Sequence, residues 1–251
     1  MVVIADMGDG LVAERLDRSS KGDCFEKARD YSARKFGVDS KAHEDVMRGI
    51  DVESVTGSNY FFNKCVDVIL PEDRRVITYG DMFKIYADSR HAFLDVYSPI
   101  SNDLTDTYSD TTTLVLRSVV VDSSISRNLA AIAKEAGQEF SPENPLLISG
   151  LEMEKDIDWK SPYGIVLKAG SDTSFRNDWR LASSRDGGRG VFGRVPVRYW
   201  GRDEFRDLEL RVRASKEGAS RVVADCVTVS TAWDDFTLAG PTGRVVIVRP
   251  K

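Results

Sequence analysis

The sequence predicts an α+β fold, with a mixed N-terminal part that contains helices and a β-rich C-terminal part. Two observations indicate this class. Helical periodicity is concentrated before Gly137, whereas short apolar runs separated by glycine and polar turns dominate beyond Ser161. Such runs in succession are typical of an antiparallel sheet, a sandwich or a barrel. We expect a mixed region over 1–112 and a mostly β region with one helix over 113–251, or one integrated domain.

Two helices are predicted near the N-terminus. Asp23 and Glu26 have the spacing of a capping box, in which the N-cap side chain and the residue at N3 satisfy free backbone N–H groups. Apolar residues follow at near-helical intervals, so a helix is expected over 23–36. Ser40 is expected to cap a second helix.

A hairpin and a loop are predicted next. Apolar residues alternate through 60–70, which predicts a strand, and 75–79 is its expected hairpin partner. The polar segment 98–112 is predicted to be a loop. Its aspartates, which lack the spacing of a calcium loop, are expected to be solvated turn residues. They are Asp103, Asp106 and Asp110.

In the C-terminal region, short apolar runs predict strands and one amphipathic run predicts a helix over 126–137. The clearest alternation is that of Leu208, Leu210 and Val212 with polar neighbours. Strands are expected near 114–121, 146–151, 163–168, 191–199, 207–214, 221–230 and 244–249.

Composition excludes several classes of protein. The three cysteines, Cys24, Cys65 and Cys226, are scattered, so neither a disulfide framework nor a thiolate zinc site is indicated. The first residues do not resemble a signal peptide, and no apolar run approaches the ~20 residues that cross a bilayer. We therefore expect a soluble, cytoplasmic protein with no membrane partner.

Few residues are suited to catalysis. With only two histidines, His43 and His91, a multi-histidine metal site is excluded, and the serine-hydrolase elbow G-x-S-x-G is absent. A Cys65–His91 nucleophile pair has no supporting signature. No cofactor and no metal site are predicted, and the sequence does not decide whether the chain is an enzyme.

Residues 188–195 read G-R-G-V-F-G-R-V, which resembles the glycine-rich loop of protein kinases. That family requires a lysine-bearing strand, His-Arg-Asp and Asp-Phe-Gly after the loop, and none of them follows here. We interpret the glycines of residues 186–190 as those of a hairpin loop between 179–181 and 191–197. The alternative is a phosphate held by backbone N–H groups together with Arg185, Arg189 and Arg194.

Two further motifs involve carboxylates. Asp122, Ser124 and Ser126 form D-x-S-x-S, which resembles the metal-ion-dependent adhesion site of von Willebrand factor A domains and implies one hard cation. The expected parallel βα pattern is missing, so we interpret Ser124 or Ser126 as a helix N-cap. Asp158 and Lys160 form the D-x-K triplet found in nucleases, for which Glu143 or Glu152 would be a metal partner.

Charge is unevenly distributed along the chain. From Phe175 onward there are 15 Lys and Arg against 10 Asp and Glu, and 13 of those cations are arginine. Arginine binds phosphate and carboxylate in a planar, bidentate geometry. On a regular strand over 191–200, Arg194 and Arg198 would share a face with Phe192 and Trp200. The predicted anion-binding residues are Arg185, Arg189, Arg194, Arg198 and Trp200.

Three functions are compatible with these patterns. The first is a non-enzymatic binding or structural protein whose arginines and aromatic residues contact a polyanion, with nucleic acid as the expected partner. The second is a metal-dependent phosphoesterase or nuclease that uses carboxylates dispersed in sequence. The third is a self-assembling subunit of a virion or complex, in which the same arginines pair with another copy in a homo-oligomer.

Overall fold

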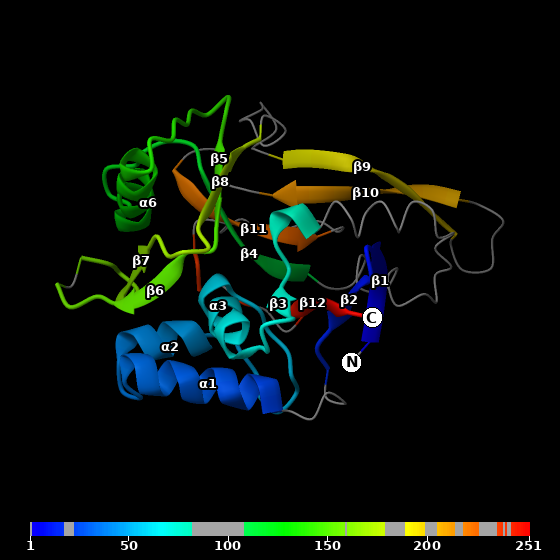
Figure 1. Cartoon of the computed structure of the whole chain (residues 1–251), viewed down its shortest axis with the longest axis horizontal. Helices are drawn as coiled ribbons and strands as arrows, with labels where there is room; N and C mark the ends of the chain where they lie inside the picture. The colour runs from blue at the N-terminus through cyan, green and yellow to red at the C-terminus, as the bar shows by residue number, and fades with distance from the viewer. Residues whose placement is uncertain are drawn as a thin grey trace.

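The computed structural model describes residues 2–17, 23–81, 108–158, 160–178, 189–198, 205–213, 218–225, 235–237, 239 and 242–251. Within these residues the N-terminal part carries helices and the rest is dominated by antiparallel sheets (Figure 1). The α+β class predicted from the sequence is therefore confirmed. None of the helices in the described part of the chain has both the length and the apolar character required to span a membrane.

One sheet has four strands and joins segments that are far apart in sequence. Its order is β1 (Val2–Gly8), β2 (Leu11–Arg15), β12 (Val246–Pro250) and β3 (Arg75–Val76). The antiparallel pairing of β12 with β2 and with β3 places it between two N-terminal strands. The division at 112/113 remains a prediction, but a single sheet includes strands from both sides of it.

A second sheet has six strands, all paired antiparallel. At one end of the sheet β9 and β10 form a long ribbon, which extends away from α6 and the β6–β7 hairpin in Figure 1. The strand order is β8 (Ser174–Asn177), β5 (Leu146–Ser149), β4 (Tyr108–Leu116), β11 (Ala219–Asp225), β10 (Phe205–Arg213) and β9 (Arg189–Arg198). The separate hairpin consists of β6 (Glu152–Lys155) and β7 (Ile165–Lys168).

Three helices lie where helical periodicity predicts them. They are α1 (Asp23–Phe36), α2 (Lys41–Met47) and α6 (Ser124–Glu135). The predicted cap of α2 is confirmed, because the Ser40 hydroxyl accepts a hydrogen bond from the backbone N–H of His43 at 3.1 Å. A serine in this position satisfies one of the free donors of the first helical turn.

The predicted strand over 60–70 is wrong, since this segment is the helix α3 (Tyr60–Ile69). Asn59 caps it by accepting a hydrogen bond from the N–H of Phe62 at 2.8 Å. Every residue from Tyr60 to Val66 is buried, so this part of the helix is covered on all sides, whereas Val68 in the last turn is exposed. Periodicity cannot separate such a helix from a buried strand. The predicted hairpin partner instead pairs with β12, through β3.

The predicted loop over 98–112 is wrong in its last residues, because β4 begins at Tyr108. All residues from 110 to 117 are buried, including Asp110. The described core is one continuous cluster that takes side chains from both predicted regions. In it Phe61 packs against Phe236, with ring centroids 6.1 Å apart. Strands β1, β2, β6 and β8 were not predicted.

Candidate polyanion-binding ribbon and the buried polar network

The pairing of β9 with β10 contains one irregularity that determines which residues share a face. The two strands are antiparallel from Arg198 opposite Phe205 to Arg189 opposite Arg213. Between these ends, Leu210 lies opposite Gly193 and Arg211 opposite Val191, which leaves Phe192 as an extra residue on β9. An extra residue of this kind is a β-bulge, and it shifts the alternation of the strand by one position.

The bulge brings arginines of odd and even sequence number onto one face. Residues directly opposite in an antiparallel pair share a face, and residues two apart on one strand do so as well. Without the extra residue, Arg189 would lie on the opposite face from Arg194 and Arg198. With it, the pairing gives one face five arginines, which we call the arginine face. Its charged residues are Arg189, Arg194, Arg198, Arg211, Arg213, Asp207 and Glu209.

The other face of the ribbon is mainly apolar. Its register positions are occupied by valine, leucine and glycine, with Arg206 as the one charged residue among those that pair. Over the two strands there are six arginines and two acidic residues, a net charge of +4. The ribbon is therefore amphipathic, and its positive charge is concentrated on the arginine face.

Most of the ribbon extends past the neighbouring strand. β11 pairs with β10 only from Arg211 to Arg213, so the part of the ribbon from Phe205 to Leu210 has no third strand among the described residues. Of the elements that the structure describes, only β10 makes extensive contacts with β9. Figure 1 shows these two strands as a long ribbon at one side of the molecule.

The structure describes three of the five predicted anion-binding residues. Arg189, Arg194 and Arg198 all lie on β9 and on the arginine face. Arg185 and Trp200 lie outside the described residues. Sequence reasoning did not assign Arg211 and Arg213 to the site, although the alternation of β10 was recognised. What it lacked was the register, which alone shows that both strands contribute to one face.

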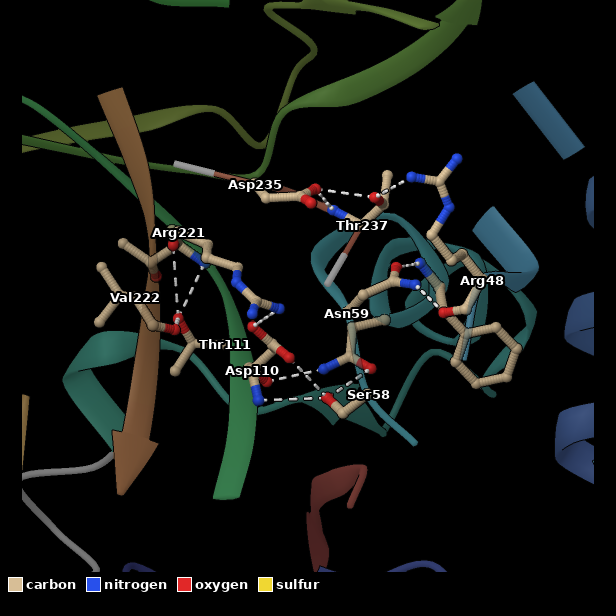
Figure 2. A network of polar contacts seen from close by, with 12 residues as sticks. Arg48, Ser58, Asn59, Asp110, Thr111, Arg221, Val222, Asp235 and Thr237 are labelled. Atoms are coloured by element: carbon tan, nitrogen blue, oxygen red, sulfur yellow. Dashed lines mark hydrogen bonds and ion pairs between the residues drawn. The ribbon is translucent and has the colours of Figure 1, made fainter. Parts of the chain in front are cut away.

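A second polar feature is a buried network of hydrogen bonds around Asp110 and Arg221 (Figure 2). Arg221 of β11 donates from Nη1 to Oδ1 of Asp110 on β4 at 2.8 Å, and their side chains are 2% and 0% exposed. The Ser58 hydroxyl donates to Oδ2 of Asp110 at 3.0 Å. The side-chain amide of Asn63 donates to the backbone carbonyl of Asp110 at 2.7 Å. The pair thus links two strands to the N-terminal end of α3.

Burial dominates the electrostatics of this pair. It raises the pKa of Asp110 to about 6, although the charge of Arg221 and the hydrogen bonds from Ser58 and Arg221 act in the opposite direction. The expectation that Asp110 is a solvated turn residue is wrong. Because neither charged group is accessible, we assign the pair a structural role: it connects β4, β11 and α3, and no substrate could reach the carboxylate.

The network continues around the end of α2. The buried carboxylate of Asp45 accepts hydrogen bonds from Lys41, at 2.8 Å, and from Arg48. Arg48 also donates to the hydroxyl of Thr237 at 3.2 Å, and that hydroxyl donates to Asp235 at 2.7 Å (Figure 2). These contacts attach the described residues 235–237 to the helical layer.

The D-x-S-x-S motif forms a helix cap in the structure. The serine that caps α6 is Ser123, whose hydroxyl accepts from the N–H of Ser126 at 3.2 Å. A serine therefore caps this helix as predicted, but it is Ser123 and not Ser124 or Ser126. The Ser126 hydroxyl bonds instead to the backbone of Val120, accepting from its N–H at 3.0 Å and donating to its carbonyl at 3.1 Å.

The two charged residues of the nuclease-like triplet, Asp158 and Lys160, lie between β6 and β7. Lys160 donates to Asp158 at 2.8 Å, and both side chains are largely exposed. The buried carboxylate of Asp156 organises this loop by accepting from the N–H groups of Asp158 and Ser161. The described residues contain no group of three His, Cys, Asp or Glu residues placed to hold a metal ion. The metal-dependent phosphoesterase remains a prediction with no described carboxylate cluster to support it.

The cysteine–histidine hypothesis gains no support from the described residues. Burial raises the pKa of the Cys65 thiol to about 12, so the thiolate is not populated at neutral pH. His91 lies outside the described residues. The other histidine, His43, shares a hydrogen bond of 2.9 Å between its Nδ1 and the hydroxyl of Ser32, which is fully buried.

Comparison of the chain with protein-family models, with curated proteins and with solved structures found no match in any of the three. The fold and the candidate site therefore define the protein by their own features: an α+β protein with an amphipathic, arginine-bearing β-ribbon at one end of a six-stranded sheet.

Proposed function

We propose that this protein is a non-enzymatic nucleic-acid-binding protein that contacts the phosphate backbone through the arginine face of the β9–β10 ribbon. The observation that carries the proposal is the pairing register, in which the bulge at Phe192 brings Arg189 onto the face of Arg194 and Arg198. A two-stranded ribbon with cations on one face offers the guanidinium geometry that phosphate oxygens favour.

The mechanism of binding follows from charge. Each arginine that neutralises a phosphate releases condensed counterions, so affinity falls as salt concentration rises. Asp207 and Glu209 lie on the same face, and Glu209 is directly opposite Arg194. They lower the net charge of the face, and we expect moderate affinity with clear salt dependence rather than indiscriminate tight binding.

The proposal is tested by replacing the three arginines of β9 together. We expect R189A/R194A/R198A to weaken binding of a fluorescent oligonucleotide and to lower the slope of log K against log salt by about 2 to 3. Fluorescence anisotropy between 50 and 200 mM salt measures both quantities. A matched control, R29A/R34A/R127A, removes the same charge from exposed helix positions on α1 and α6.

The two triple variants separate a local site from general attraction. If the β9 variant binds more weakly than the control, the arginine face is the binding site. Equal losses in both would show that only net charge matters, and no binding by the unmodified protein at low salt would remove the proposal.

A self-assembling subunit is the second candidate, because β9 is one of the two edge strands of the described six-stranded sheet. An outermost strand presents unpaired backbone groups to another chain. Pro196 lies within β9 and has no N–H, so it interrupts that row of donors. For this reason nucleic-acid binding is the preferred proposal and homo-oligomer formation stays a prediction.

A further inference from the structure

We infer that the ribbon binds a single strand of nucleic acid, which lies extended along β9, rather than a duplex. This inference rests on the proposed function and specifies its ligand. It is drawn from the spacing of the arginines in the pairing register and from the residues that lie between them.

The three arginines of β9 are evenly spaced. Arg198, Arg194 and Arg189 lie opposite Phe205, Glu209 and Arg213, which are four residues apart on β10. At ~3.3 Å per residue, successive arginines are about 13 Å apart along the ribbon and the row is about 26 Å long. The bulge produces this regularity, because the sequence numbers alone place the arginines four and five residues apart.

A row of this length suits a flexible strand better than a rigid double helix. A duplex completes one turn in roughly 34–36 Å, so over the length of this row each of its backbones winds about three quarters of the way around the axis. A row of cations that follows one strand then meets any one backbone of the duplex only locally. An unpaired strand can straighten and follow all three arginines, with several nucleotides between successive contacts.

Aromatic residues are placed along the same row. Phe205 lies opposite Arg198 at one end, and Phe192 is the bulge residue between Arg194 and Arg189. Single-strand binding surfaces combine a line of positive charge with rings on which unpaired bases stack. In a duplex the bases are already stacked on one another, so these rings would add little.

The arginine row is tested by moving one arginine without changing charge or composition. In R189G/G190R the arginine shifts by one position and leaves the arginine face. We expect this variant to bind a single-stranded 15-mer as weakly as R189A does. The slope of log K against log salt should be lower by about 1 than for the unmodified protein. In the matched control R189V/V191R the arginine shifts by two positions and stays on the face, so the slope should be retained.

If R189G/G190R binds as the unmodified protein does, while circular dichroism shows that both variants are folded, the row is not the site. The class of ligand is tested with the same 15-mer as a single strand and as a duplex. Tighter binding of the single strand supports the inference. Tighter binding of the duplex overturns the inference and leaves the proposed function standing, whereas no binding of either removes both.

Discussion

Arg221 donates a charge-assisted hydrogen bond to Asp110, and both side chains are buried. Removing two charges from water is costly, and their attraction offsets that cost only when further hydrogen bonds complete the site. Ser58 supplies such a bond to the carboxylate. At the scale of single residues, loss of one partner of this pair should therefore destabilise the fold.

The raised pKa of Asp110 predicts a specific pH dependence. A carboxyl group whose pKa rises from 3.8 when unfolded to about 6 when folded binds its proton more tightly in the folded state. Its contribution to stability is therefore present below about pH 4 and is lost as the pH rises through about 6. Urea unfolding of the wild type and of Asp110→Asn between pH 4 and 7 should show the wild type losing stability relative to the variant as pH increases.

The variant Asp110→Asn is a suitable reference because asparagine keeps the shape and cannot titrate. Parallel pH profiles for the two proteins would show that Asp110 ionises in the folded state as it does in the unfolded chain. That result would contradict the raised pKa that burial gives to Asp110.

At the scale of elements, α3 depends on a cap that also connects to α2. Asn59 accepts from Phe62 at the start of α3, and its amide donates to the carbonyls of Val46 and Arg48. Ser123 caps α6 with a hydroxyl that accepts from Ser126. The two caps therefore differ in burial and in the number of groups that they satisfy.

We expect Asn59→Ala to lower the free energy of unfolding by about 2 kcal/mol or more, since it removes a cap and leaves buried carbonyls without a donor. Ser123→Ala, the matched control, should cost about 1 kcal/mol. Urea denaturation of both variants gives the comparison. Equal losses would mean that the link from Asn59 to α2 contributes nothing.

The elements also show how far sequence reasoning extends. Helix α2 could be predicted because its capping residue, Ser40, is a local signal, and α1 because its apolar residues recur at helical intervals. Helix α3 could not, because Val66, Val68 and Leu70 also fit the two-residue period of a strand, and Asn63 and Lys64 are buried although they are polar. Strand β10 was recognisable by alternation, whereas the bulge in β9 depends on which strand is its partner.

Only part of the arginine face was predicted, because the sequence shows local charge but not strand pairing. Three of its arginines lie close together in sequence, and a local excess of charge is visible there. Asp110 was placed wrongly because its partner, Arg221, is 111 residues away and only the folded chain brings them together. The burial of a polar residue is decided by such distant partners, which no local pattern records.

At the scale of the whole molecule, β12 makes the two predicted regions interdependent. It pairs with β2 on one side and with β3 on the other, and its residues Val246 to Val248 are buried. A fragment of residues 1–112 lacks this strand, so we expect it not to fold alone. Circular dichroism and amide proton dispersion in NMR spectra of the fragment would check this, and a folded fragment would instead support two separate domains.

The position of β12 has a further consequence for how the protein is made. Strands β2 and β3 both end by Val76, yet the strand that lies between them begins at Val246. During synthesis on the ribosome, the edges of β2 and β3 that pair with β12 lack this partner while some 170 further residues are added. Newly made chains should therefore expose strand edges to chaperones until β12 has been synthesised.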